Sequence, residues 1–263
     1  MRRLVKLIYL LLQHPLHLHR WLVKRGLYQG WINDFKPFWD AIRPVGLPIT
    51  DYASYTWMEY YFTTKFREAK PTGDHFEDVA AQYARLLSFI KRREMHPLRM
   101  LKVAWHLRKA QTVLEFGAGA APYAHFLKTA WPLGQNVYTQ DIPSLLRQYQ
   151  KWWLGGTDMP AGWHYDAIVC TEVFEHLNRP YQVAQQMVQA APLIAFDYIV
   201  EPGRDNEARR WLTMGVFKDA GTLTGPDKRG LYVWRRNNST LLDATPKAIY
   251  LSRFATGYHT VKF

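Results

Sequence analysis

Two glutamates and a histidine stand close together in the run Glu172-Val-Phe-Glu175-His176. If a helical turn begins there, the three side chains share a face, because residues three and four positions apart are neighbours on a helix. Two carboxylates and an imidazole that converge in this way could hold Mg²⁺ or another divalent cation and leave positions open for substrate oxygens. Such a cation would lower the pKa of a bound hydroxyl and make it a better nucleophile. Without a metal, His176 is the natural general base, because imidazole titrates close to neutral pH.

A second run, Val-Leu-Glu115-Phe-Gly117-Ala-Gly119, predicts a strand that enters a tight turn. Glycine has no Cβ, so the backbone can adopt conformations closed to other residues and a ligand can lie against it. The helix expected at 121–128 would point the free N–H groups of its first turn at an anionic group. The turn is therefore expected to hold a ligand.

Two further positions narrow the choice of that ligand. A dinucleotide-binding turn has a third glycine where this chain has Pro122, so a pyrophosphate is disfavoured. Asp141 follows the next strand-like run, Asn136–Gln140. A carboxylate at that place can accept hydrogen bonds from both hydroxyls of a ribose.

Taken in order, the segments 113–126 and 165–177, with Asp141 between them, resemble class I S-adenosylmethionine-dependent methyltransferases over about residues 98–200. The resemblance implies a Rossmann-like methyltransferase fold and S-adenosyl-L-methionine as the cofactor. Asp158 occupies a stretch where related enzymes contact adenine, and it would serve equally well as a plain turn residue. The cofactor-binding residues that the resemblance implies are Glu115, Gly117, Gly119, Asp141, Asp158 and Glu172.

The run from Glu172 to His176 is similar to the Glu-x-x-Glu-His block of metal-assisted O-methyltransferases, notably those of ubiquinone biosynthesis and those that methylate the 2′-hydroxyl of small-RNA ends. This similarity implies Glu172, Glu175 and His176 as metal ligands, and His176 and Glu175 as catalytic residues. In many metal-independent relatives a similar stretch only lines the cleft or caps the following helix. Both interpretations stay open.

Composition sets the outer limits on the kind of protein. A chain of 263 residues, 48% of them hydrophobic, is long enough for one large domain or for a catalytic domain with an appendage. The single Cys170 cannot form an intramolecular disulfide, which suits the cytoplasm, and its apolar neighbours predict a buried structural thiol. The net charge of +12 could attract nucleic acid, anionic lipid or a phosphorylated metabolite, or could simply be a solvated basic face.

The N-terminal segment is both apolar and basic. An apolar run at 7–12 follows two arginines and a lysine, but it is too short to span a bilayer, and no small-residue cleavage site follows it. We therefore expect no export. Residues 1–20 are expected either to pack on the body of the protein or on a second subunit, or to make peripheral contact with a membrane. The nearby His14, His17 and His19 have no further metal ligand in view.

We divide the chain into an N-terminal helical extension at 1–97 and a cofactor-binding catalytic domain at 98–263. Residues 31–70 are dense in aromatic side chains, most of which are expected to fill a small helical core while a few face the substrate. Apolar residues at helical spacing predict two helices that lead into the first strand, at 78–93 and 98–107. By the resemblance, this extension would act as a lid and choose the substrate.

Strands that alternate with helices predict an open, doubly wound and mostly parallel sheet. The ligand then belongs at the carboxyl ends of the strands. The expected parallel strands, apolar enough for burial on both faces, are Thr112–Phe116, Asn136–Gln140, 165–170 and 193–200. The expected helices between them are 121–129, 144–149 and 181–190. The expected closing antiparallel pair is 231–235 and 248–253, after loops at 201–230, with 258–263 as a third candidate.

Three functions remain open at this level. The first is an O-methyltransferase that acts on a small-molecule or lipid-type acceptor, and the acid-acid-histidine block favours it. The second is a nucleic-acid methyltransferase, which the net charge of +12 and the many aromatic residues favour. The third is a binding protein that keeps the fold without the chemistry, which the intact Glu115, Gly117, Gly119 and Asp141 disfavour.

Overall fold

The computed structural model describes residues 29–69, 78–93, 97–142, 144–154, 164–177, 179–199, 207–227 and 230–237. Several expectations lie outside these ranges and are not tested by the structure: those for the segment 1–20, for Asp158, and for the runs 248–253 and 258–263. Within the described ranges, every helix is too short or too polar to cross a lipid bilayer.

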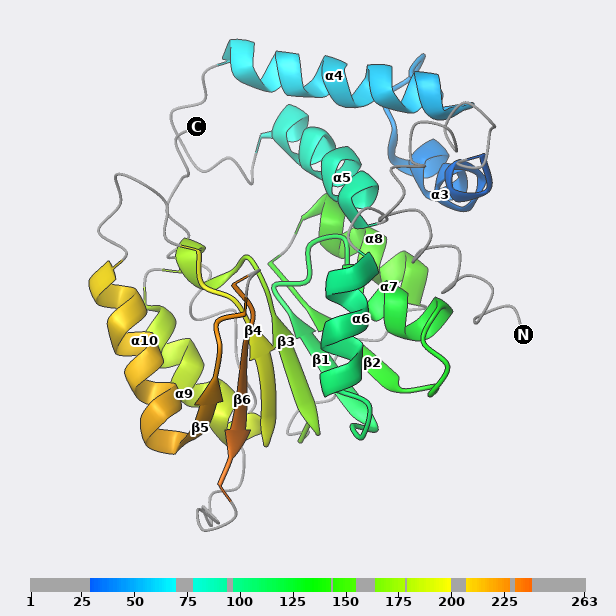
Figure 1. Ribbon diagram of the computed structural model, residues 1–263. Coiled ribbons are helices and arrows are strands. Elements are labelled where there is room, and N and C mark those ends of the chain that lie inside the picture. The colour runs from blue at the N-terminus through cyan, green and yellow to red at the C-terminus, as the bar shows by residue number, and fades with distance from the viewer. Residues whose placement is uncertain are drawn as a thin grey trace.

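A twisted six-stranded sheet, with the strand order β2-β1-β3-β4-β6-β5, forms the centre of the molecule (Figure 1). Strands β2, β1, β3 and β4 run parallel to one another, whereas β6 runs antiparallel to β4, and β5 runs antiparallel to β6. The strands are β1 (Thr112–Phe116), β2 (Asn136–Gln140), β3 (Ala167–Cys170), β4 (Leu193–Phe196), β5 (Gly221–Thr224) and β6 (Tyr232–Arg236). The doubly wound, mostly parallel sheet is therefore confirmed.

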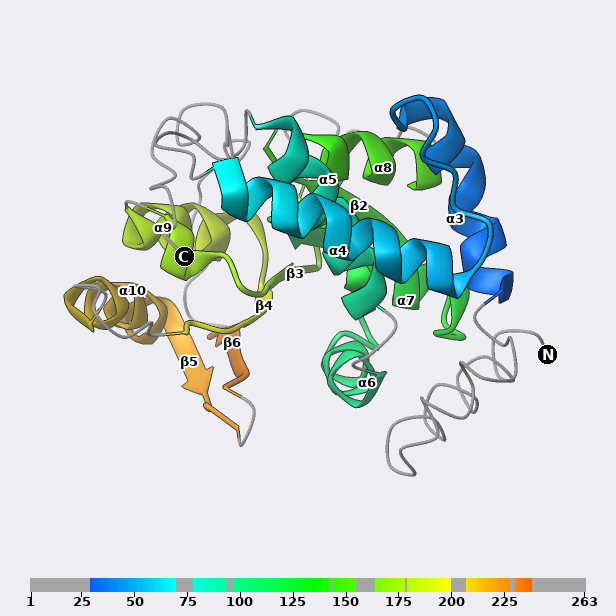
Figure 2. The same cartoon turned by 90° about the horizontal axis from the view of Figure 1, so that it is seen from above.

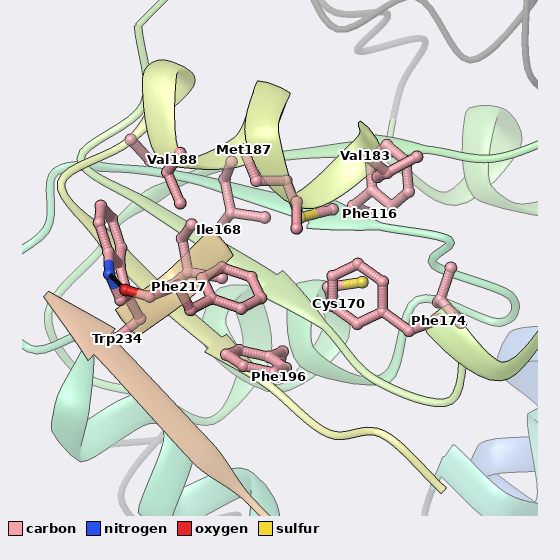
Figure 3. Close-up of a cluster of buried hydrophobic side chains, with 14 of the residues drawn as sticks. Phe116, Ile168, Cys170, Phe174, Val183, Met187, Val188, Phe196, Phe217 and Trp234 are labelled. Carbon is pink, nitrogen blue, oxygen red and sulfur yellow. Dashed lines mark hydrogen bonds between the residues drawn. The ribbon is translucent and has the colours of Figure 1, made fainter. Parts of the chain in front are cut away.

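Alternate residues of each strand point to opposite faces of the sheet, and helices cover the apolar side chains on both faces. On one face Phe116, Ile168 and Cys170 pack against α9 and α10, and Trp234 donates a 2.7 Å hydrogen bond to the carbonyl of Phe217 (Figure 3). On the other face the intervening strand residues pack against α6 and α7. Cys170 is fully buried, as predicted. The helices are α6 (Pro97–His106), α7 (Pro122–Thr129), α8 (Leu145–Leu154), α9 (Pro180–Ala190) and α10 (Glu207–Ala220).

The closing antiparallel pair differs from the expectation. The partner of β6 at the edge of the sheet is β5, which lies inside the stretch expected to be loops, and α10 precedes it there. The strand β5 is short and its residues alternate between half-buried and exposed, so it lacks the apolar run that marks the inner strands. In α10 the exposed Trp211 and Leu212 obscure the helical spacing of the buried residues.

Three N-terminal helices form a separate core of aromatic residues that sits over the upper end of the sheet (Figures 1 and 2). They are α3 (Gln29–Ile42), α4 (Tyr52–Ala69) and α5 (Val79–Arg93). Half of the aromatic residues described between 31 and 70 are buried in this core and three more are half-buried, whereas Trp57 and Tyr60 are exposed. Ala120, Leu146 and Tyr149 complete the same core, so the helices are attached to the glycine turn and to α8. The side chain of Gln82 in α5 also accepts a 3.1 Å hydrogen bond from the amide of Leu145 at the start of α8.

Candidate functional site

The residues singled out in the sequence meet at one edge of the sheet. The glycine turn follows β1, Asp141 follows β2, and Glu172 lies just beyond β3. Because these strands are parallel, their carboxyl ends lie side by side, and this is the edge where ligands bind in open α/β sheets. The structure therefore places these residues at the carboxyl ends of neighbouring strands, as expected, while the individual side chains take positions that differ from the expected ones.

Glu115 is buried and holds the start of helix α7. Its two carboxylate oxygens accept hydrogen bonds from the amides of Tyr123, at 3.2 Å, and Ala124, at 2.7 Å. Pro122, the first residue of this helix, has no N–H group to offer, and the amide of His125 bonds to the carbonyl of Ala121. The expectation of free N–H groups at this helix start is therefore wrong, because a side chain of the protein already occupies them.

The environment of Glu115 predicts a dependence of stability on pH. Burial raises the pKa of Glu115 to about 8, and the two amide hydrogen bonds only partly oppose this rise. Because the folded pKa lies above the unfolded value, the proton stabilises the folded state at low pH. We expect the free energy of unfolding to fall by up to about 1.4 kcal/mol per pH unit as the pH rises towards 8.

The variant Glu115→Gln tests this expectation, because a neutral amide of the same shape keeps one acceptor oxygen and cannot titrate. Its unfolding free energy, measured in urea at several pH values between 5 and 9, should depend less on pH than that of the wild type. Parallel curves for the two proteins would show that Glu115 does not titrate in this range.

The glycine turn is closely packed in this structure. Gly117 has a φ angle of 64°, and a Cβ added there would collide with the side chain of Val173. A Cβ on Gly119 would lie 3.6 Å from the ring of Phe89 in α5, which is an ordinary contact. Gly117 is therefore required by the loop after β3 as well as by its own backbone, and Phe89 brings the N-terminal helices onto the turn.

Asp141 ties the carboxyl ends of β1 and β2 together. One of its carboxylate oxygens accepts hydrogen bonds from the amide of Gly119 at 2.6 Å and from the side chain of Gln150 at 3.0 Å. The other oxygen accepts from the amide of Ile142 at 2.8 Å. Burial raises the pKa of Asp141, and these three hydrogen bonds oppose the rise. Asp141 is half-buried and lies where the ribose contact was predicted.

The block that follows β3 does not bring its three predicted ligands together. A short 3₁₀ turn runs from Phe174 to His176, but Glu172 precedes it, with a φ angle of 57° and an exposed side chain. Glu175 is buried and His176 is half-buried. Among the residues that the structure describes, no three or more His, Cys, Asp or Glu side chains are grouped so as to hold a metal ion. The expected convergence of these side chains is therefore not found.

A buried ion pair that was not predicted from the sequence contacts Glu172, at the start of the run from Glu172 to His176. Asp197, the residue after β4, is 3% exposed and pairs with the guanidinium group of Arg99 in α6. Its other oxygen accepts a 2.6 Å hydrogen bond from the amide of Glu172, whose carboxylate lies 3.7 Å from Arg99. Burial raises the pKa of Asp197, and Arg99 opposes the rise. The signal available in the sequence was an acid close to the carboxyl end of a strand-like run, as at Glu115 and Asp141.

Comparisons with known proteins support the fold. No protein-family model matches the chain, and no curated protein matches it either. Among solved structures, an O-methyltransferase family protein from Burkholderia thailandensis aligns over 84% of this chain and 94% of its own, with a TM-score of 0.51 and 11% identity. At this level of identity, the likeness shows that the chain shares the fold of that protein.

Two further solved structures align less closely. Human N-acetylserotonin methyltransferase, solved in complex with SAM, aligns over 70% of this chain and 68% of its own, with a TM-score of 0.44 and 12% identity. The N-terminal domain of EvdMO1, solved with SAH bound, aligns over 68% of this chain and 97% of its own, with a TM-score of 0.41 and 13% identity.

Proposed function

We propose that this protein is an S-adenosylmethionine-dependent methyltransferase and that it methylates an oxygen of a small-molecule or lipid-type acceptor. The observation that carries the proposal is the order of groups along one edge of the sheet. Asp141 lies after β2, the glycine turn after β1, and the turn with His176 after β3, on neighbouring strands of a fold shared with an O-methyltransferase family protein.

The residues at this edge fit the needs of methyl transfer. The cofactor, when bound, supplies a methyl group already activated on a sulfonium, so the protein has only to bind, align and exclude water. Asp141 would hold the ribose, and the glycine turn would bring backbone close to the cofactor. The core of α3, α4 and α5 sits over this edge and would keep water from it.

His176 would accept the proton of the acceptor hydroxyl as the methyl group is transferred. It ends the 3₁₀ turn at the carboxyl end of β3, on the strand next to the glycine turn. An imidazole titrates close to neutral pH, so it can take up and release a proton at the pH of the cell. We expect His176→Ala to remove methyl transfer and to leave the affinity for S-adenosylhomocysteine unchanged.

One group of basic residues lies away from the candidate site, which weakens the case that its charge serves to bind a nucleic acid there. Arg108 and Lys109 precede β1, and Arg235 pairs with Leu193 at the start of β4. Burial lowers the pKa of His106, and Arg235, Lys102 and Arg108 lower it further, which shows that these cations lie near one another. They surround the amino ends of the parallel strands, at the opposite end of the sheet from the candidate site.

Transfer of a labelled methyl group tests the proposal. The protein is incubated with methyl-labelled S-adenosylmethionine and a cell extract, which is then separated into organic-soluble molecules, water-soluble small molecules, RNA and protein. We expect label in one of the small-molecule fractions with the wild type and none with His176→Ala. Label confined to RNA would support the nucleic-acid alternative, and no label in any fraction would favour a binding protein without the chemistry.

A further inference from the structure

A buried hydroxyl without a partner lies one strand beyond the turn that carries His176. Tyr198 follows β4 by two residues, is 5% exposed, and stacks on Phe174 with the ring centroids 6.0 Å apart. No group in the described part of the chain forms a hydrogen bond with its hydroxyl. A buried donor left unsatisfied costs about 1 to 3 kcal/mol, so its presence calls for an acceptor from outside the described structure.

Among the described residues, the charges that act on this hydroxyl are predominantly positive. They come from Arg209 and Arg210, in the first turn of α10, and from Glu175 in the 3₁₀ turn. Among the residues that the structure describes, these two cations and one anion leave one positive charge unbalanced. Arg210 donates a 2.7 Å hydrogen bond to the hydroxyl of Tyr232, whereas the side chain of Arg209 has no ion pair or hydrogen bond with any residue that the structure describes.

Tyr198 is suited to donate its proton to an anion. Burial raises the pKa of Tyr198 to about 12, and Glu175 adds to the rise while both arginines oppose it. The hydroxyl therefore stays protonated at neutral pH. Arg209 and Arg210 are only half-buried, so an anion can approach their guanidinium groups from solvent.

The place of this group along the sheet fits an acceptor rather than the donor. Strand order sets β2 and its Asp141 at one side of the site and β4 three strands away at the other. Neighbouring strands lie about 4.8 Å apart, so the two strands are separated by about 14 Å. A donor whose ribose lies at Asp141 and whose methyl group reaches β3 leaves the end of β4 for the molecule that receives the methyl group.

We propose that Tyr198, Arg209 and Arg210 form an anion-binding subsite that holds a carboxylate or phosphate group of the methyl acceptor. The inference rests on the proposed function, because it assigns the anion to the acceptor. Tyr198 donates its O–H to one anionic oxygen, and the two guanidinium groups neutralise the charge. The acceptor is therefore an acidic small molecule that also carries the hydroxyl to be methylated.

Thermal unfolding with two probe anions tests the subsite. The melting temperature is measured in sodium phosphate and in sodium benzoate, each compared with sodium chloride at equal ionic strength. We expect at least one probe to raise the melting temperature of the wild type by about 2 to 4 °C, because a ligand that binds only the folded state stabilises it. A response to phosphate indicates a phosphorylated acceptor, and a response to benzoate indicates a carboxylic acid.

Three variants make the test specific. Tyr198→Phe and Arg209→Gln should lose the response, and Arg179→Gln, at an exposed arginine before α9, should keep it. Without a probe anion, Tyr198→Phe should melt at or above the temperature of the wild type, because it removes an unsatisfied hydroxyl. The subsite is rejected if neither probe acts on the wild type, or if Tyr198→Phe and Arg209→Gln respond as the wild type does.

Titration of S-adenosylhomocysteine into the same samples separates this inference from the proposed function. Binding of S-adenosylhomocysteine without any response to the anions would reject the subsite and leave methyl transfer standing. A response to the anions without binding of S-adenosylhomocysteine would reject the acceptor role and the proposed function together. Both responses in the wild type, with the anion response lost in Tyr198→Phe, would support the inference.

Discussion

Replacing Arg99 by methionine is expected to lower the free energy of unfolding by about 3 to 5 kcal/mol, because it leaves the carboxylate of Asp197 buried without its partner. The pair is well shielded, with side-chain exposures of 19% for Arg99 and 3% for Asp197. Methionine has a similar volume to the aliphatic part of arginine, so the loss reflects charge more than packing. Denaturation by urea measures it directly.

The loss of unfolding free energy caused by Arg99→Met should become smaller as the pH falls. Burial already raises the pKa of Asp197 in the wild type, and Arg99 opposes that rise, so removing Arg99 raises the pKa further. A carboxylate whose folded pKa lies above its unfolded pKa destabilises the folded state once it ionises, and this penalty disappears below the unfolded value of about 4. The difference between variant and wild type should therefore be largest near neutral pH and smallest near pH 4.

Lys102→Met, in the same helix, provides a matched control. Lys102 pairs with Asp227, but its side chain is 47% exposed, so the loss should stay below about 1 kcal/mol and should vary little with pH. Adding Asp197→Asn to Arg99→Met should recover part of the stability, because the buried charge is then gone. Equal losses of unfolding free energy in Lys102→Met and Arg99→Met would show that the buried pair of Arg99 and Asp197 does not stabilise the fold in this way. A double variant less stable than Arg99→Met alone would show the same.

The parallel part of the sheet was predictable because β1, β3 and β4 are largely apolar runs, and the strand-like run of β2 leads directly to Asp141. The runs that became β1 and β2 match the expected bounds, and β3 and β4 lie within the expected ranges. The edge strand β5 was not predictable in this way, because only one of its faces is sheltered and three of its four residues are glycine or threonine. Helix α10 was missed for a related reason, since Trp211 is apolar in type but 76% exposed.

The positions of the candidate site residues in the fold were predictable, and their contacts were predictable only in part. Asp141 and the two glycines stand near one another because short turns connect them to neighbouring strands. Arg99 and Asp197 are 98 residues apart, so no local pattern could pair them. The partners of Glu115 are backbone amides, which any sequence possesses, and for this reason the sequence could not show that its carboxylate holds α7.

Replacing Asp141 by alanine is expected to weaken the binding of S-adenosylhomocysteine by about 100-fold. A carboxylate can accept about four hydrogen bonds, and Asp141 accepts three in this structure, so one position remains for a ribose hydroxyl. A hydrogen bond to a charged group contributes about 1.5 to 3 kcal/mol, and a factor of 100 corresponds to about 2.7 kcal/mol. The loosened amide of Gly119 should add to the loss.

Asp166→Ala separates this binding role from a purely structural one. Asp166 lies at the opposite end of the sheet, where its carboxylate accepts hydrogen bonds from the amides of Gln111 at 2.7 Å and Thr112 at 2.9 Å. Its replacement also removes an acid that binds two backbone amides, but far from the candidate site. We expect Asp166→Ala to lower the stability and to leave the affinity for S-adenosylhomocysteine unchanged. Equal losses of affinity in Asp166→Ala and Asp141→Ala would show that the lower affinity comes from a general loss of stability.

The most direct test of the central claim is a calorimetric titration of S-adenosylhomocysteine into the folded wild-type protein. The glycine turn, Asp141 and the strand order predict binding to one site per chain, with NAD as a dinucleotide control that does not bind. Saturable binding of S-adenosylhomocysteine alone is the predicted result. Absence of binding, in a sample shown to be folded by its cooperative unfolding, would contradict the account.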